Sequence, residues 1–169
     1  MTTPAAGTYP AYMQGYISLV KANNIKEAIE TYAIAINDFF SKFPLNKIDY
    51  RYAENKWSPK EMLQHIIDTE RIFGYRALTL ARQDKTPLPG FDENNYATAS
   101  NATARSWNDL LEEFTAVRKS TDFLLQSFTE EQLSQSSITN NSPNTTIAIA
   151  YAIFGHILHH INILRERYL

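Results

Sequence analysis

Three of the four histidines in this chain have a spacing that can bring their rings together. His156 and His160 are four residues apart, so they lie on nearly the same face of a helix with about 3.6 residues per turn. His65 belongs to an earlier helical segment, in which it shares a face with mostly apolar neighbours. Three neutral imidazoles that converge in a helical bundle can hold a divalent metal and leave one coordination position open. The spacing therefore predicts a metal site formed by His65, His156 and His160, called the histidine trio below.

The segments that must position these rings repeat apolar residues at helical spacing, which predicts an all-α fold in a single domain over residues 1–169. The first helix should be interrupted near Asn23-Asn24. The second begins with the clearest signal, Ser58-Pro59 followed by Glu61, which can form a capping box. Four helices are expected at residues 10–42, 59–82, 106–128 and 146–167, with a short helical turn at 129–132 and a loop at 134–145. The buried side of the third helix is expected to contain Leu110, Leu111, Phe114, Val117, Phe123 and Leu124.

The connection between the second and third helices is long. Residues 85–101 contain two prolines and Gly90 and fit no regular element. A second helix about 35 Å long can be crossed by about 11 extended residues, so the connection can make helices two and three parallel. The fold class that follows is a four-helix bundle in the order up-down-down-up. In that order helices two and four are antiparallel, which places His65 and His160 at similar depths, about 10 and 12 Å from one end of the bundle.

Simpler interpretations of the histidines also exist. An inward histidine is more often a hydrogen-bonded core residue, and a His-x-x-x-His pair arises by chance. Burying three imidazoles without partners would cost a few kcal/mol, however, and a metal removes that cost. His159 is rotated by about 100° from His160 on the helix, so we assign it to the rim of the site.

Several charged residues could support the site. Asp92 or Glu93 of the crossover could add a carboxylate ligand. Asp68 and Glu61 could orient the metal-bound rings, although solvated helix charges are the simpler interpretation. Arg76 faces inward by its spacing and could hold a substrate carboxylate, with a salt bridge as the safer interpretation. We leave these alternatives open.

Composition narrows the class of protein. The net charge of -2 gives no electrostatic reason to expect a nucleic-acid or membrane partner. We expect no run of the roughly 18 apolar residues that a membrane-spanning helix needs, and no secretory signal at the N-terminus. The chain has no cysteine, so any metal must be held by nitrogen or oxygen. A cytoplasmic location is the default expectation.

Three stretches resemble the DinB/YfiT-like superfamily, and the likeness covers roughly residues 12–169. They are Asp49-Tyr50-Arg51-Tyr52 with Lys56-Trp57-Ser58-Pro59 leading into His65, then Leu88-Pro89-Gly90-Phe91-Asp92, and the Gly155-His156 to His159-His160 ending with Leu164-Arg165-Glu166-Arg167-Tyr168. The resemblance implies a four-helix bundle with a divalent metal, commonly nickel or zinc, on His65, His156 and His160. It also implies frequent homodimers and a bacterial source.

The resemblance constrains the site better than the reaction. Characterised members of the family include metal-dependent transferases acting on low-molecular-weight thiols and a maleylpyruvate isomerase. We therefore expect a metal-dependent transferase of the small-thiol type or a hydrolase, acting on a small molecule. The alternative is a non-catalytic, stress-related, metal-binding module that works as a homodimer.

Overall fold

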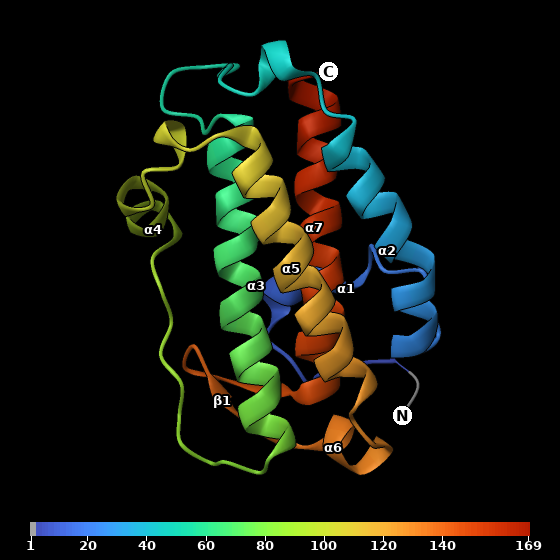
Figure 1. Cartoon of the computed structure of the whole chain (residues 1–169). Coiled ribbons are helices and arrows are strands. Elements are labelled where there is room, and N and C mark those ends of the chain that lie inside the picture. Colours follow the sequence, from blue (N-terminus) through green and yellow to red (C-terminus); the bar gives the residue numbers. More distant parts are fainter. Residues whose placement is uncertain (1–2) are drawn as a thin grey trace.

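The computed structural model describes residues 3–169, and four long helices dominate it (Figure 1). They are α2 (Ile25–Ser41), α3 (Pro59–Ala81), α5 (Trp107–Gln126) and α7 (Thr146–Arg167). Figure 1 shows α2 and α7 running in one direction and α3 and α5 in the other. The up-down-down-up bundle expected from the length of the crossover is therefore confirmed.

Short elements connect the long helices. They are 3-10 helices at Ala11–Met13, Leu45–Lys47 and Ala102–Ala104, α1 (Gln14–Ile17), α4 (Glu93–Ala99), α6 (Glu130–Ser134), and the strands β1 (Ser136–Thr139) and β2 (Ser142–Thr145). The predicted interruption of the first helix is confirmed, because the Asn24 side chain accepts a hydrogen bond from the Glu27 backbone and begins α2. The capping boxes at the starts of α3 and α6 are both present.

The prediction of a plain loop at residues 134–145 is wrong. β1 and β2 pair as an antiparallel hairpin, in which Thr139 is opposite Ser142. Its two turn residues, Asn140 and Asn141, have φ of 49° and 58°. Two positive φ angles are typical of the two-residue hairpin turn, and asparagine tolerates this conformation well. The chain is thus a helical bundle with one small hairpin.

The crossover is also more ordered than its sequence suggested. Leu88 donates a backbone hydrogen bond to Ile138 (3.0 Å) and accepts one from Asn140 (2.9 Å), so the crossover is tethered to the hairpin. Beyond this tether, the Asp92 side chain accepts hydrogen bonds from the backbone of two following residues and begins α4. The expectation that this segment contains no regular element is wrong.

α3 and α7 form the centre of the bundle, and α7 is buried on nearly all sides. Within residues 3–169, α7 is the one helix long and apolar enough to cross a membrane by length and composition, so the expectation that no such apolar run exists is wrong. Most of its apolar window, 78%, is buried among the other helices, as in the core helix of a bundle. On α5 the prediction that Phe123 is buried is wrong: it is 64% exposed, and Leu125 is buried instead.

Candidate metal centre

The structure brings the rings of the histidine trio together between α3 and α7. The Nε2 atom of His156 lies 3.0 Å from Nε2 of His65 and 3.0 Å from Nε2 of His160. One ring nitrogen from each residue lies within 4.8 Å of the other two. All three residues are buried, with exposed fractions of 5 to 7%. The antiparallel arrangement of α3 and α7 produces this convergence, as the matching depths predicted.

The surroundings of the trio keep its rings neutral. Burial lowers the pKa of His65 from 6.5 to about 4, and His159 adds to the shift. The pKa values of His156 and His160 are lowered well below the ordinary value, again chiefly by burial and then by the neighbouring imidazoles. A neutral imidazole has a free ring nitrogen lone pair, which is the form that binds a metal.

The arrangement fits a divalent cation better than a hydrogen-bond network. The Nε2 atom of His156 carries either one proton or one lone pair, so it cannot form good hydrogen bonds with both neighbours. Three nitrogen ligands about 2.0 Å from a tetrahedral ion would lie about 3.3 Å apart, close to the two observed separations. Nδ1 of His160 is buried without a hydrogen-bond partner, so packing rather than an acceptor orients that ring. The trio therefore fits a divalent metal held through Nε2.

Aromatic side chains hold the rings in place. The centroid of the Trp57 ring lies 4.7 Å from the centroid of the His65 ring. Trp57 directly precedes Ser58, the N-cap residue of α3. From the other side, the Tyr16 ring of α1 meets His156 edge-on at 5.5 Å. This contact depends on Gly155, because a Cβ there would lie 2.1 Å from the Tyr16 carbonyl oxygen. The glycine lets α1 lie directly against α7.

His159 lies beside the trio, as expected for a rim residue. It is half-buried, and its ring lies 5.3 Å from that of Tyr16. It is not among the three histidines whose ring nitrogens converge. The assignment of His160 to the trio and His159 to the rim agrees with this geometry.

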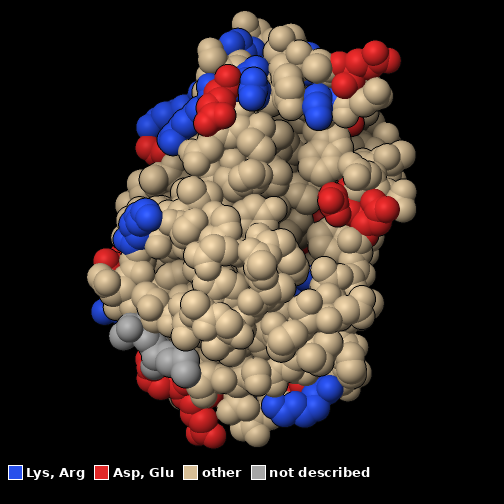
Figure 2. Space-filling view, turned by 180° about the vertical axis from the view of Figure 1, so that it is seen from behind, with Lys and Arg blue, Asp and Glu red and all other residues tan. Residues whose placement is uncertain are grey.

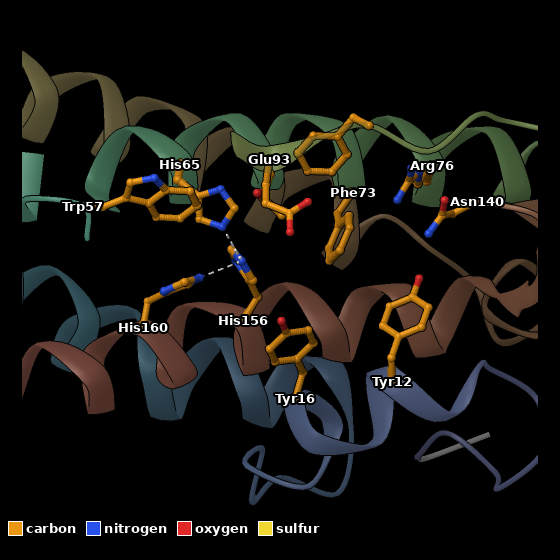
Figure 3. Close-up of a pocket in the computed structure, with 12 residues that line it drawn as sticks. Tyr12, Tyr16, Trp57, His65, Phe73, Arg76, Glu93, Asn140, His156 and His160 are labelled. Carbon is orange, nitrogen blue, oxygen red and sulfur yellow. Dashed lines mark hydrogen bonds between the residues drawn. The ribbon is translucent and has the colours of Figure 1, made fainter. Parts of the chain in front are cut away.

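The trio forms one end of a cavity of about 340 Å³, drawn in Figure 3. Other lining residues come from α3 and the loop before it, from the N-terminal segment, from the crossover and from the hairpin. They are Tyr12, Tyr16, Trp57, Thr69, Phe73, Arg76, Phe91, Glu93 and Asn140. This volume is typical of a site for a small molecule.

Figure 2 shows the opposite side of the bundle from Figure 1, where charged side chains are sparse across the middle.

The two acidic residues of the crossover have different roles. Glu93 lines the cavity, and in Figure 3 its carboxylate points into the space beside His65 and His156. Burial raises the pKa of Tyr16, and the negative charge of Glu93 adds to this shift. Asp92 uses one carboxylate oxygen to cap α4, at 2.9 Å from two backbone nitrogens. Of the two, only Glu93 faces the trio.

The proposed orienting carboxylates of α3 are engaged elsewhere. Asp68 accepts a hydrogen bond from Gln64 at 3.0 Å. Glu61 completes the capping box with Ser58 and forms an ion pair of 2.7 Å with Arg51. Both acids therefore serve the helix locally, but they are not the solvated charges of the simpler interpretation, since their side chains are 22% and 14% exposed.

Arg76 is inward, as its spacing predicted, but the salt bridge considered the safer interpretation is not formed. It is 5% exposed, lines the cavity, and has no carboxylate partner within the described part of the chain. Sequence reasoning missed Tyr12, Tyr16 and Asn140. The spacing of Tyr12 and Tyr16, four residues apart, is a signal for a shared helical face. Asn140 has a local signal as well, because two consecutive asparagines favour the two-residue hairpin turn in which it lies.

Comparison with known proteins agrees with this geometry. The family model described as the DinB superfamily matches residues 34–164. A relative from Oceanobacillus iheyensis, named "Putative metal-dependent hydrolase", is 27% identical in an alignment of 137 residues that covers 79% of this chain and 77% of the relative. The solved structure of YfiT from Bacillus subtilis is described as "a probable metal-dependent hydrolase with an unusual four-helix bundle topology". It matches with a TM-score of 0.71 and 14% identity, over 97% of this chain and 90% of that chain. At that identity the likeness shows a shared fold.

Proposed function

The chain belongs to the DinB superfamily, and we propose that it is a metal-dependent hydrolase acting on a small molecule. The histidine trio and the relatives fit a metal-dependent enzyme. The observation that carries the proposal is the convergence of three neutral imidazoles at the wall of a cavity that also receives the Glu93 carboxylate. Nitrogen ligands disfavour calcium and magnesium, so zinc or nickel is the proposed ion. Action in the cytoplasm of a bacterium is part of the same proposal.

Each residue has a distinct part in this hydrolysis. His65, His156 and His160 would hold the ion, which supplies Lewis acidity to a bound water or carbonyl group. Glu93 would take a proton from the attacking water onto its carboxylate and return it to the leaving group. The water oxygen becomes bonded to the acyl carbon, and the ester or amide bond to the leaving group breaks. Trp57 and Tyr16 hold the rings between them and limit the access of solvent.

A direct test measures metal content and turnover together. Protein purified without an affinity tag should contain about one zinc or nickel ion per chain by elemental analysis. The loaded protein should hydrolyse chromogenic esters or anilides above the level of a His65→Ala control. Glu93→Gln should keep the metal and lower kcat by about 10²-fold or more, because it loses the proton acceptor.

The same experiment tests the other candidate activities. Turnover of thiol–electrophile pairs, in place of esters and amides, would contradict hydrolysis and support a small-thiol S-transferase. Stoichiometric metal without turnover above the His65→Ala control would support the non-catalytic module. Absence of bound metal would contradict all three and leave a hydrogen-bonded histidine core.

A further inference from the structure

Arg76 lies in the same cavity, at the end away from the trio (Figure 3). Its Nη2 donates a hydrogen bond to the Pro89 carbonyl oxygen at 2.7 Å, and its guanidinium carbon lies 5.6 Å from the centre of the Phe73 ring. A guanidinium group has five N–H donors, so one backbone acceptor satisfies only part of it. Burial lowers the pKa of Arg76, and the nearby Tyr12 hydroxyl offsets this shift only in part.

Arg118, the other deeply buried arginine among residues 3–169, has carboxylate partners within the fold. Arg118 is 2% exposed and forms ion pairs with Glu70 at 2.8 Å and Asp122 at 2.7 Å. A buried charge is costly unless it is paired, and Arg118 meets that requirement within the fold. Among residues 3–169, Arg76 has no such carboxylate. Its counter-ion is therefore expected to come from outside the chain.

Two further polar groups are turned toward this end of the cavity. Figure 3 shows the Asn140 amide close to the Arg76 guanidinium and the Tyr12 hydroxyl directed toward the same space. The hairpin places Asn140 there, and its tether to Leu88 brings the Pro89 carbonyl to Arg76. The group is thus assembled from α3, the hairpin, the crossover and the N-terminal segment.

The charge of the cavity selects the kind of anion. Among the described residues that line it, Arg76 is the only Lys or Arg and Glu93 is the only Asp or Glu. One guanidinium balances one negative charge, and its planar donors match the two oxygens of a carboxylate. A phosphate dianion would carry one negative charge more than the single guanidinium balances. The cavity therefore favours a monoanionic carboxylate.

The length of the cavity selects the shape of the ligand. His65 and Arg76 are eleven residues apart on α3, close to three full turns, so they face the same side about 16 Å apart along the axis. Thr69 and Phe73 line the cavity between them. Oγ1 of Thr69 is buried without a hydrogen-bond partner, so it offers a polar contact midway. A ligand that reaches both ends must be extended.

We propose that Arg76, with Asn140 and Tyr12, binds the terminal carboxylate of an extended substrate whose hydrolysable bond lies at the histidine trio. The position of that bond rests on the proposed function. The carboxylate subsite itself rests on the contacts of Arg76.

The test uses linear hydroxamic acids of increasing length with a carboxylate at the far end. The hydroxamate group is a metal ligand, and the matching carboxamides serve as neutral controls. By titration calorimetry on the zinc-loaded protein, the carboxylate of best length should bind about tenfold tighter than its carboxamide, or more. Arg76→Gln should reduce this ratio to about one, and Arg76→Lys should give an intermediate ratio.

Arg82→Gln is the matched control. Arg82 ends the same helix and lies over Phe128, outside the cavity, so this variant should keep the wild-type ratio. The proposal would be overturned if the ratio of carboxylate affinity to carboxamide affinity were the same in the wild type and in folded Arg76→Gln. If Arg76→Gln does not fold, the Arg76 Nε–H resonance of the wild-type protein decides. It should shift on addition of the carboxylate and not of the carboxamide, and no difference between the two would overturn the proposal.

Failure of the metal proposal gives a separate result. If removal of zinc leaves hydroxamate affinity unchanged, the trio does not hold the metal that the hydroxamate needs, and the proposed function fails. The Arg76 resonance is measured in metal-free protein as well, where its response to the carboxylate still supports or overturns the subsite.

Discussion

Burial is the main reason that the imidazoles of the histidine trio stay neutral, and their chemistry depends on that neutral state. The same property makes the metal-free protein sensitive to acid, because protonated rings cannot remain buried next to one another. The buried arginines show the same rule for permanent charge: Arg118 is paired within the fold, and Arg76 faces the cavity. At this scale, burial and charge indicate which side chains are structural and which are available to a ligand.

His65 gives a prediction about pH for the metal-free protein. Its pKa is about 4 in the folded chain, against 6.5 for an ordinary histidine. Since the folded state binds this proton less readily, the stabilising contribution is fully present above pH 6.5 and is lost as the pH falls toward 4. The loss over this window is about 3 kcal/mol. Urea unfolding of wild type and His65→Gln at successive pH values should show a shallower dependence in the variant; parallel curves would contradict the prediction.

Arg118 gives a prediction about stability. Arg118→Met leaves the Glu70 carboxylate buried without its partner, and burial already raises the pKa of Glu70. The free energy of unfolding should fall by about 3–5 kcal/mol. The double variant Arg118→Met with Glu70→Gln should recover a large part of that loss, which chemical denaturation would measure. A double variant as unstable as the single one would show that packing of Arg118, and not its charge, is what matters.

At the scale of elements, the site depends on close contacts made by short segments. α1 lies against α7 at Gly155, the hairpin tethers the crossover through Leu88, and Asp92 begins the helix that presents Glu93. With Tyr16, Glu93 and Asn140 these elements complete the cavity wall, whose other residues come mainly from α3 and α7. Their geometry therefore controls what the trio can bind.

Gly155→Ala tests the contact between α1 and α7. The new Cβ would lie 2.1 Å from the Tyr16 carbonyl oxygen, so α1 must move away. We expect a loss of about 1–3 kcal/mol in the free energy of unfolding and a change in the Tyr16 environment, measured by denaturation and NMR. Gly74→Ala is the control, because a Cβ there meets nothing within 4 Å. It should stabilise α3 by about 0.5–1 kcal/mol. Equal effects of the two substitutions would be inconsistent with the close approach.

Asp92→Ala separates capping from metal binding. It removes the side chain that caps α4, which should cost about 1 kcal/mol locally and speed hydrogen exchange at the first amides of α4. Metal content by elemental analysis should stay the same, because Asp92 does not reach the trio. A loss of metal in this variant would instead make Asp92 a ligand.

At the scale of the whole molecule, a metal on the trio would join α3 to α7 at the centre of the bundle. Because these two helices carry most of the core, binding there should stabilise the complete fold rather than one local segment. The predicted homodimer stays a prediction that sedimentation of the metal-loaded protein can test.

Metal removal gives the corresponding prediction. With zinc at about 100 times its Kd, the fold gains about 2.7 kcal/mol, which is a rise in Tm of about 5–10 °C for a domain of this size. Calorimetry with and without a chelator should show this shift in the wild type. His160→Ala should abolish the shift, and the adjacent His159→Ala should keep it. Loss of the shift in both variants would contradict the distinction between trio and rim.

Much of this protein follows from local patterns in its sequence. Ser58, Pro59 and Glu61 mark the start of α3 because a helix N-terminus needs caps, and this signal is local. The four-residue spacing of His156 and His160, and the matching depth of His65, follow from the fixed rise and period of a helix. The length of the crossover sets the order of the bundle for the same geometric reason.

Contacts between segments far apart in the chain cannot be predicted from local sequence patterns. The backbone tether between Leu88 and the hairpin creates the wall that carries Asn140, and it joins the crossover to residues far along the chain. The pairing of β1 with β2 is local, but its residues are mostly polar and show no alternating periodicity. Phe123 is exposed because the neighbours of α5, and not its own sequence, select the buried face. The absence of a carboxylate beside Arg76 within residues 3–169 likewise depends on which distant side chains the fold brings to it. Helix geometry therefore placed the trio, whereas long-range packing shaped the cavity into which it opens.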